Sequence, residues 1–326
     1  MSHTLPFPVG FALGVIACTA ASLAAAQTYP VKPVRIVTGF APGGSTDVIA
    51  RLVGNKLAEV LGQPFVIEHR PGAATAIAAE RVASAPPDGY TLLLIAASTT
   101  SQSALRKKAL PYDLENGFAH ISMLAVGPFV LLVHPSVPVK DVKALIALAR
   151  AQPGKLNVGS PGVGSVNHLA ALLFNHRAKL SMTYVAYKGS AEAVVAVASG
   201  QIDLSFPSVP AALPLMAQQR VRALAVTSAQ RVPVIKDVPT IAEAARPGYE
   251  YSGALGLSAP AGTPREIIAR LNTSIVKVVN TPELREAIAK IGFEAQTSTA
   301  EQYTAFIKDD IAKIAVAVAA AGLKVE

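Results

Sequence analysis

One unit recurs along this chain and constrains its fold more than any other feature: an apolar run, a loop of small residues and a helical stripe. The first unit begins with VRIVTGF at residues 34–40, a short apolar run that predicts a buried strand. After the loop, apolar residues recur at three-to-four spacing over residues 48–61, and this spacing predicts a helix. Ser45 or Thr46 supplies the N-cap of this helix and Gly62 its stop. A chain built from such units places its strands in a parallel sheet that helices cover.

Further units extend this pattern through two blocks of the chain. In the first block, FVIEHRPGA at 65–73 predicts a second strand, and AAERVASAPPDGYTLLLIAAS at 78–98 predicts a helix, a turn and a third strand. The second block begins after FVLLVHPS at 129–136; helices are expected at 140–151, 165–178 and 190–200, and strands at 155–160, 182–188, 202–206 and 222–228. The predicted fold class is α/β with two domains, each a mostly parallel sheet flanked by helices.

The end of the chain decides how the two domains are connected. Helices expected at 264–279 and about 300–322 have no sheet of their own, so we expect them to pack on the first block. Domain 1 is then discontinuous, residues 27–127 plus 250–326, and domain 2 is residues 128–249. Two α/β domains joined by two crossings, near 126–131 and 250–256, with a cleft between them, have the geometry of a hinge-closing binding protein. Ligands of α/β proteins sit at the carboxyl ends of the strands.

The first 26 residues differ in kind from the rest of the chain. They contain no Lys, Arg, Asp or Glu, and Ala24-Ala25-Ala26 fits the small-residue rule for signal cleavage. We therefore expect a signal peptide at 1–26 and export to the periplasm, although the segment before its apolar core lacks the usual positive charge. An uncleaved anchor, a mispredicted start, and lipidation of Cys18 are the alternatives. Cys18 is the only cysteine, so a chain cut after Ala26 has no disulfide and no thiol chemistry.

Composition weighs against one class of partner. Of the 326 residues, 51% are hydrophobic and 15% are charged, which suits well-packed domains rather than disorder. The formal net charge of +8 is scattered, the longest basic run is Arg106-Lys107-Lys108, and tryptophan is absent from the sequence. Nucleic acid is therefore not an expected partner, because its binding platforms combine basic grooves with aromatic side chains.

Two loops place glycines and hydroxyl side chains immediately before a helix. In GFAPGGSTDVIAR at 39–51, Gly43 and Gly44 let a ligand approach the backbone, because neither has a Cβ, and Pro42 holds the turn. A helix N-terminus has unpaired N–H groups and a partial positive charge, so it binds anions without a charged side chain. This loop alone can equally be a plain capped connection. The loop GSPGVGSVNHL at 159–169 repeats the chemistry in the second block, so two loops can hold one ligand from opposite sides.

Other chemistries fit these residues less well. APGGSTD has no Lys for a P-loop, GVGSVN lacks the third glycine of a dinucleotide fingerprint, and Val158 stands where a nucleophile elbow needs glycine. His168 and His176 are eight residues apart on one expected helix, which disfavours a metal pair. No catalytic residue, metal or cofactor is expected. Structural or solvent roles are expected for the remaining candidates, which are Asp47, His69, His120, His134 and Asp203.

Six stretches, in order, resemble the Bug-type extracytoplasmic solute receptors of tripartite tricarboxylate transporters and cover essentially the whole mature chain. They are YPVKPVRIVTGFAPGGSTDVIAR, RPGAATAIAAERVASAPPDGYTLL, ALPYDLENGFAHISML, GSPGVGSVNHLAA, YKGSAEAVVAVASGQIDLSF and LAVTSAQR with VPTIAEA. The resemblance implies a type II-like periplasmic binding protein of the Venus-flytrap kind, without catalysis. It also implies that loop 40–46 holds a ligand carboxylate largely through backbone groups and ordered water, and that the loop from Ser160 to Ser165, with His168, closes on it. In two departures, Ala74-Thr75-Ala76 replaces a frequent Gly-Gly-Asn and His69 a common Asn.

The resulting hypothesis is a periplasmic, monomeric receptor that captures a small carboxylate (a di- or tricarboxylate or an aromatic acid) for a tripartite tricarboxylate-type transporter. Its membrane subunits are the expected protein partners. Alternatives are a ligand sensor for a signalling partner and an enzyme on the same scaffold; an enzyme would need a nucleophile–base pair that the sequence does not show. Ser98, Thr99, Lys188 and Gly189 follow strands and are candidates for the rim of the site, although each can equally belong to an ordinary turn. The full candidate set is Phe40, Ala41, Pro42, Gly43, Gly44, Ser45, Thr46, Ser98, Thr99, Ser160, Gly162, Gly164, Ser165, His168, Lys188 and Gly189.

Overall fold

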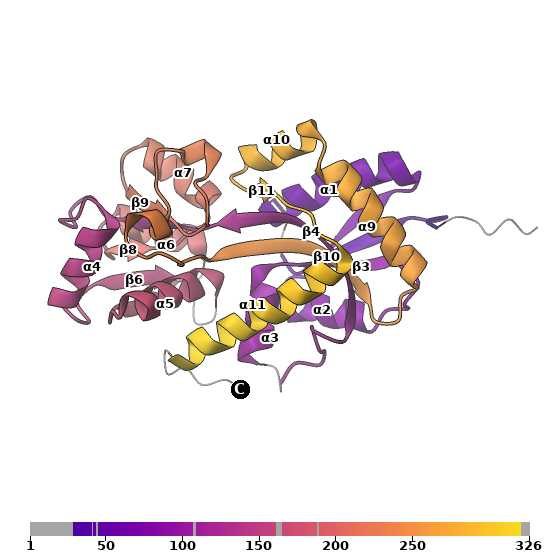
Figure 1. Ribbon diagram of the computed structural model, residues 1–326, viewed down its shortest axis with the longest axis horizontal. Coiled ribbons are helices and arrows are strands. Elements are labelled where there is room, and N and C mark those ends of the chain that lie inside the picture. The colour runs from indigo at the N-terminus through magenta and orange to yellow at the C-terminus, as the bar shows by residue number, and fades with distance from the viewer. Residues whose placement is uncertain are drawn as a thin grey trace, which may run out of the picture.

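The computed structural model of this chain describes residues 29–40, 42–43, 45–106, 109–160, 165–187 and 189–320. The predicted signal peptide, Cys18, and Lys107-Lys108 of the basic run lie outside the described residues. Figure 1 shows two sheets, each surrounded by helices, at opposite ends of the long axis of the molecule. The predicted two-domain α/β fold class is confirmed.

The first sheet contains the three strands predicted for the first block. Its order is β11–β4–β10–β3–β1–β2, formed by β1 (Val34–Thr38), β2 (Phe65–His69), β3 (Thr91–Ile95), β4 (Phe118–Pro128), β10 (Ser252–Pro260) and β11 (Glu294–Ala295). β1 is parallel to β2 and to β3, whereas β10 is antiparallel to β3 and β4, and β11 to β4. Every residue of β3 is buried, as expected for a strand covered on both faces.

The second sheet is formed by the strands of the second block. Its order is β7–β6–β8–β5–β9, formed by β5 (Val130–Val133), β6 (Asn157–Ser160), β7 (Thr183–Ala186), β8 (Leu204–Ser205) and β9 (Arg222–Val226). β6 is parallel to β7 and β8, whereas β5 is antiparallel to β8 and β9. Each sheet is therefore a parallel βα core extended by antiparallel strands.

The antiparallel strands correct the expectation of mostly parallel sheets. β4 and β10, neither of them a predicted strand, pair from Phe118 and Pro260 to Pro128 and Ser252. Glycines interrupt the apolar pattern of both strands, and packing requires glycine at two of these positions, Gly127 and Gly256. A Cβ on Gly127 would overlap the ring of Phe293, and a Cβ on Gly256 would overlap the ring of Tyr303. The strand signal is weak here because large aromatic rings from other segments occupy the space.

The helices of the first sheet include the first one predicted. They are α1 (Ser45–Leu61), α2 (Ala76–Ala83), α3 (Ala97–Leu105), α9 (Arg265–Val279), α10 (Pro282–Lys290) and α11 (Ala300–Ala320), with a 3-10 turn η2 at Ala73–Thr75. The buried face of α1 includes Ile49, Val53 and Leu57, at four-residue spacing. Gly62 ends α1 in a left-handed conformation (φ 73°), and its N–H donates to Ala58 O at 2.9 Å.

The second sheet is flanked by the helices predicted for its block and by two that the sequence did not indicate. They are α4 (Val142–Ala151), α5 (Val166–Ala178), α6 (Ser190–Ala198), α7 (Val209–Ala217) and α8 (Ile241–Ala244), with a 3-10 turn η3 at Pro233–Ile235. Among the unpredicted helices, α7 contains Pro214 and α8 is a single turn, while α3 of the first sheet has the sequence ASTTSQSAL. Their sequences carry weak helical signals, so tertiary packing decides their conformation.

The two chain crossings between the sheets lie side by side. β4 ends at Pro128 in the first sheet and β5 begins at Val130 in the second. The Phe129 ring between them stacks on Tyr251, just before β10, with centroids 5.6 Å apart and planes at 22°. Thr227 joins both crossings: its Oγ1 accepts from Phe129 N at 2.8 Å, and its carbonyl accepts from Tyr251 N at 2.8 Å.

Helix α11 packs against both parts of the molecule. It contacts α3 and β4 of the first sheet and also α5 of the second, and in Figure 1 it runs below the long strands β4 and β10. Its residues Ile307, Ile311 and Ile314 belong to a hydrophobic core that also contains Leu169 of α5 and Phe129. Packing on the first block was expected, and the contact with α5 is new. None of the described helices is long and apolar enough to span a membrane.

Candidate functional site

The carboxyl ends of the parallel strands lie level within each sheet. Thr38, the last residue of β1, pairs with His69 of β2 on one side and with Leu94 of β3 on the other. In the second sheet, Ser160 of β6 pairs with Ala186 of β7. Loop 40–46, the start of α3, and the starts of α5 and α6 therefore leave their sheets at these edges, where α/β proteins bind ligands. Every described candidate residue belongs to one of these segments, except Ser160, which is the last residue of β6.

Loop 40–46 is held in place by Asp47 and His69. Asp47 Oδ2 accepts from Gly43 N at 3.0 Å and from Arg51 Nε at 3.1 Å. His69 lies between the loop and Asp47, with Nδ1 2.9 Å from Phe40 O and Nε2 3.2 Å from Asp47 Oδ1. These contacts fix the turn from within the fold, so the backbone at Gly43 is held without a ligand. Sequence reasoning named both Asp47 and His69 but not this link between them.

The Asp47 carboxylate is the charged group of this loop. Burial by itself would raise the pKa of Asp47, but the hydrogen bonds from Gly43 N–H and Arg51, with the charges of Arg51 and His69, outweigh it and hold the pKa below its ordinary value. Asp47 is therefore ionised near neutral pH and engaged in ordering the loop. It is not arranged as a catalytic acid.

Gly43 is exposed at the tip of the loop, next to the exposed Pro42. Its φ of +88° lies in the left-handed region that favours glycine, and a Cβ built there would meet no heavy atom within 4 Å. Of the candidate residues of this loop, Phe40, Pro42, Ser45 and Thr46 are also described, and Ala41 and Gly44 are outside the described residues. The N–H groups of the first turn of α1 have no acceptor within an α-helix. The loop thus presents backbone donors beside an open glycine.

The candidates after β3 lie in helix α3 rather than in an exposed turn. Thr99 is 1% exposed, and its Oγ1 lies 3.3 Å from Ala96 N, whose hydrogen it accepts, and 3.0 Å from Thr75 Oγ1. The hydroxyl oxygen of Ser98 is buried and has no hydrogen-bond partner among the described residues. Thr99 is therefore not the rim residue that sequence reasoning expected, and Thr75 joins the group without having been a candidate.

The second-sheet edge is organised around the start of α5. Ser165 caps this helix, its Oγ accepting from His168 N at 3.2 Å. Ser160, at the end of β6, is 2% exposed, and its carbonyl accepts from Tyr187 N at 2.8 Å. Gly162, Gly164 and Lys188 lie outside the described residues. Gly189 is the N-cap of α6, and a Cβ there would meet nothing within 4 Å.

His168 is an interior residue in this structure. It is 3% exposed, and its ring meets Tyr184 edge to face, with centroids 4.6 Å apart. Burial lowers the pKa of His168 to about 4, so its ring is neutral near pH 7. A charged contact from His168 to an anionic ligand is therefore disfavoured.

Asn167 is a residue of this edge that sequence reasoning missed. Its Nδ2 donates to Phe206 O at 2.7 Å and to Ser190 Oγ at 3.3 Å, so it connects the starts of α5 and α6 with the segment after β8. An amide in the first turn of a helix, next to a serine cap, is the signal that could have indicated it.

The other residues expected to be structural have contacts within the fold. Asp203 accepts from Asn157 N at 2.7 Å. His120 Nδ1 lies 2.8 Å from Ser258 Oγ, and burial lowers the pKa of His120 to about 4. Within the described chain, no group of three His, Cys, Asp or Glu side chains could hold a metal ion.

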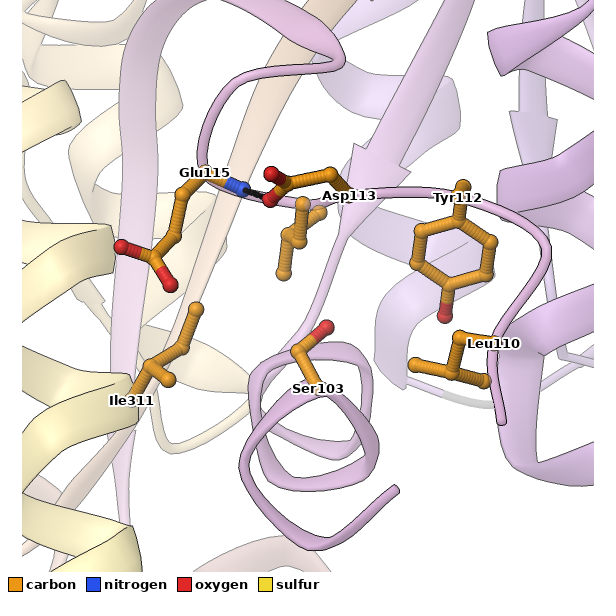
Figure 2. A pocket seen from close by; sticks show the side chains of 7 residues that line it. Ser103, Leu110, Tyr112, Asp113, Glu115 and Ile311 are labelled. Atoms are coloured by element: carbon orange, nitrogen blue, oxygen red, sulfur yellow. Dashed lines mark hydrogen bonds between the residues drawn. The ribbon is translucent and has the colours of Figure 1, made fainter. Parts of the chain in front are cut away.

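A small cavity lies away from both edges. Figure 2 shows it between α3, α11 and the segment before β4, with Asp113 accepting from Glu115 N at 2.9 Å. Its volume is about 100 Å³, whereas ligand pockets usually measure about 300–1,000 Å³. It is lined by Ser103, Leu110, Tyr112, Asp113, Leu114, Glu115 and Ile311, none of them a candidate residue. This cavity is therefore not the predicted site.

Known proteins of one kind resemble this chain over most of its length. The family model described as tripartite tricarboxylate transporter family receptor matches residues 49–323. Protein BugT of Bordetella pertussis is 34% identical to this chain and the match covers 96% of this chain and 97% of BugT. A solved R. palustris protein with adipate is 35% identical, with a TM-score of 0.80 over 91% of this chain and 99% of the other. MatC from Rhodopseudomonas palustris with bound malate is 32% identical, with a TM-score of 0.75 over 89% and 100%.

Proposed function

Because this chain belongs to the tripartite tricarboxylate transporter receptor family, we propose that it captures a small carboxylate and delivers it to the membrane subunits of such a transporter. The observation that carries the proposal is loop 40–46, held by Asp47 and His69 with Gly43 open beside the first turn of α1. Two similar proteins, with adipate and with malate, make a carboxylate the first ligand class to consider.

Neutral donors perform the binding in this proposal. Backbone N–H groups at the start of α1 and hydroxyls at the start of α3 form charge-assisted hydrogen bonds to the carboxylate, without a lysine or arginine. Closure of the second-sheet edge, through the segment after Ser160 and the start of α6, then removes the ligand from water. The proposed domains are residues 27–127 plus 250–326 and residues 128–249, in keeping with the strands that each sheet contains.

The proposed role does not include catalysis. Asp47 is engaged in holding its loop, and His168 is buried and neutral near pH 7, so neither is placed as a general acid or base. The proposed location is the periplasm, reached through the signal peptide at 1–26, and the protein acts as a monomer that docks on its transporter.

A thermal-shift screen of the purified mature protein tests this function. Adipate, malate, citrate and benzoate are titrated, each beside its uncharged amide as the matched control. We expect one acid to raise Tm in a concentration-dependent way, because ligand at about 100 times Kd adds about 2.7 kcal/mol of stability, while its amide does not. Isothermal titration calorimetry then gives the Kd. If no acid of this or a wider carboxylate panel raises Tm, the receptor proposal is wrong.

A further inference from the structure

Thr75 has a backbone conformation that a threonine rarely adopts. Its φ is 81° and its ψ is −6°, in the left-handed region, and its side chain is branched at Cβ. A residue held in this region costs about 1–3 kcal/mol, and such residues persist where the surrounding structure enforces them, often at ligand-binding sites. Thr75 is also 4% exposed, so the strained residue lies inside the fold.

The side chain of Thr75 lies beside Gly39, immediately before loop 40–46. A Cβ on Gly39 would lie 2.5 Å from the Cβ of Thr75 and 2.7 Å from its Cα, so only glycine leaves room for Thr75 there. On its other side, Thr75 Oγ1 is 3.0 Å from Thr99 Oγ1 in the first turn of α3. Thr75 therefore stands between the end of β1 and the start of α3, the two first-sheet segments that the proposed function uses.

The hydroxyl hydrogens of this pair are more numerous than their acceptors. One hydrogen lies between the two oxygens, and Thr99 Oγ1 also accepts the N–H of Ala96. Whichever hydroxyl donates within the pair, the other keeps a hydrogen for which the described chain supplies no acceptor. Both side chains are more than nine-tenths buried, and leaving a buried donor without a partner costs about 1–3 kcal/mol. The neighbouring Ser98 hydroxyl is likewise buried without a partner.

We infer that Thr75 is a ligand-binding residue whose hydroxyl, paired with Thr99, supplies a hydrogen-bond donor to an oxygen of the carboxylate held at loop 40–46. This inference rests on the proposed function, since it names a further contact in the same site. The acceptor is an anionic oxygen, because the spare hydroxyl hydrogen of the Thr75–Thr99 pair and the positive end of α3 lie at the same sheet edge as loop 40–46, where the carboxylate is proposed to bind.

The variants Thr75→Ser and Thr75→Ala test the inference, because they differ from each other by one oxygen. Kd is measured by calorimetry for adipate, malate, citrate and benzoate. We expect T75S to bind the preferred acid within about threefold of the wild type and T75A to bind it at least about tenfold more weakly, since a hydrogen bond to a charged group contributes about 1.5–3 kcal/mol. Thr75→Gly, which relaxes the backbone and also lacks the hydroxyl, should match T75A and provides the measurement if T75A folds poorly.

Gln219→Gly is the control for backbone strain alone. Gln219 is exposed and also left-handed, with φ 56°, so this change relaxes a similar conformation away from the site. It should leave Kd unchanged. If T75A and T75S bind the wild-type ligand equally, Thr75 is only structural and the inference is overturned. If the wild type binds no carboxylate, the proposed function itself fails, and this inference fails with it.

Discussion

Gly43 is the residue at which the proposed carboxylate site is easiest to disrupt without disturbing the fold. Gly43→Asp adds a fixed negative charge in open space beside the start of α1. We expect carboxylate affinity to fall by up to about a thousandfold, because two like charges about 4 Å apart repel by about 4 kcal/mol near a protein surface. Calorimetry on the folded variant measures the loss.

Two controls separate charge from backbone strain in this experiment. Gly43→Asn has a similar shape without the charge and should weaken binding much less. Gly62→Asp makes the same change at the other end of α1, where the glycine is also left-handed (φ 73°) and open, and should leave Kd unchanged. Equal affinities for G43D and G43N would mean that no anion binds near Gly43.

His69 is predicted to position the loop rather than to touch the ligand. Removing its ring in His69→Ala deletes the contacts to Phe40 O and to Asp47, so we expect Kd to rise about threefold to tenfold and stability to fall by about 1 kcal/mol. His69→Asn can keep one of these contacts, so its Kd and its stability should lie between those of the wild type and of H69A. His176→Ala, at an exposed position on α5, is the control, and an H69A variant with wild-type affinity would contradict the positioning role.

At the scale of elements, the start of α3 shows how much a helix can depend on its neighbours. Its sequence, ASTTSQSAL, gives few apolar positions, yet every one of its residues except Ser98 is buried. Its hydroxyls bond locally: Ser101 donates to Ala97 O and Ser103 to Thr99 O. Helix α11 covers α3, so burial compensates for the weak intrinsic helix preference.

Asp310 connects α11 to α3 and gives this contact a pH dependence. It accepts from Thr100 Oγ1 at 2.6 Å, and burial raises the pKa of Asp310 from 3.8 to about 6, although the hydrogen bond from Thr100 and the charge of Lys313 act in the opposite direction. Below pH 3.8 the carboxyl is protonated in both folded and unfolded states. Above about pH 6 it is ionised in both states, and the folded state has the cost of a buried charge. Asp310 therefore lowers stability as pH rises through this window.

Asp310→Asn removes this cost while keeping an acceptor for Thr100. We expect the stability of the variant to equal that of the wild type near pH 4 and to exceed it by about 1–3 kcal/mol at pH 7.5. Urea unfolding of both proteins at the two pH values measures the difference, which isolates Asp310 from the buried histidines that titrate in the same range. If the difference in free energy of unfolding between D310N and the wild type is the same at both pH values, the raised pKa of Asp310 is contradicted.

At the scale of the whole molecule, the two crossings are joined at Thr227. Its side chain is fully buried, and its Oγ1 accepts the N–H of Phe129, so Thr227→Val leaves that N–H without its partner. We expect a loss of about 1–3 kcal/mol in the free energy of unfolding, from urea titration. Thr304→Val on α11, whose hydroxyl only donates to Ala300 O, should cost about 0.5 kcal/mol. If T227V costs no more than T304V, the crossings do not depend on this bond.

Much of the architecture follows from local sequence patterns. The apolar runs and three-to-four stripes predicted β1, α1, β3, α5 and α6, because strand and helix periodicity are properties of neighbouring residues. The glycine loops also marked the two sheet edges, since glycines before a helix are a local signal. The same patterns failed for β4 and β10, whose glycines accommodate Phe293 and Tyr303 from distant segments.

The sequence by itself therefore determined the two α/β domains and the edges at which a ligand is expected. Only the tertiary structure decided which side chains support those edges and which are buried beneath them. It placed His168 in the interior, used His69 to hold loop 40–46, and forced Thr75 into a left-handed conformation against Gly39 and Thr99. The physical reason is the range of the interactions. Periodicity and turn chemistry act within a few residues, whereas burial, strain and hydroxyl pairing depend on groups that only folding brings together.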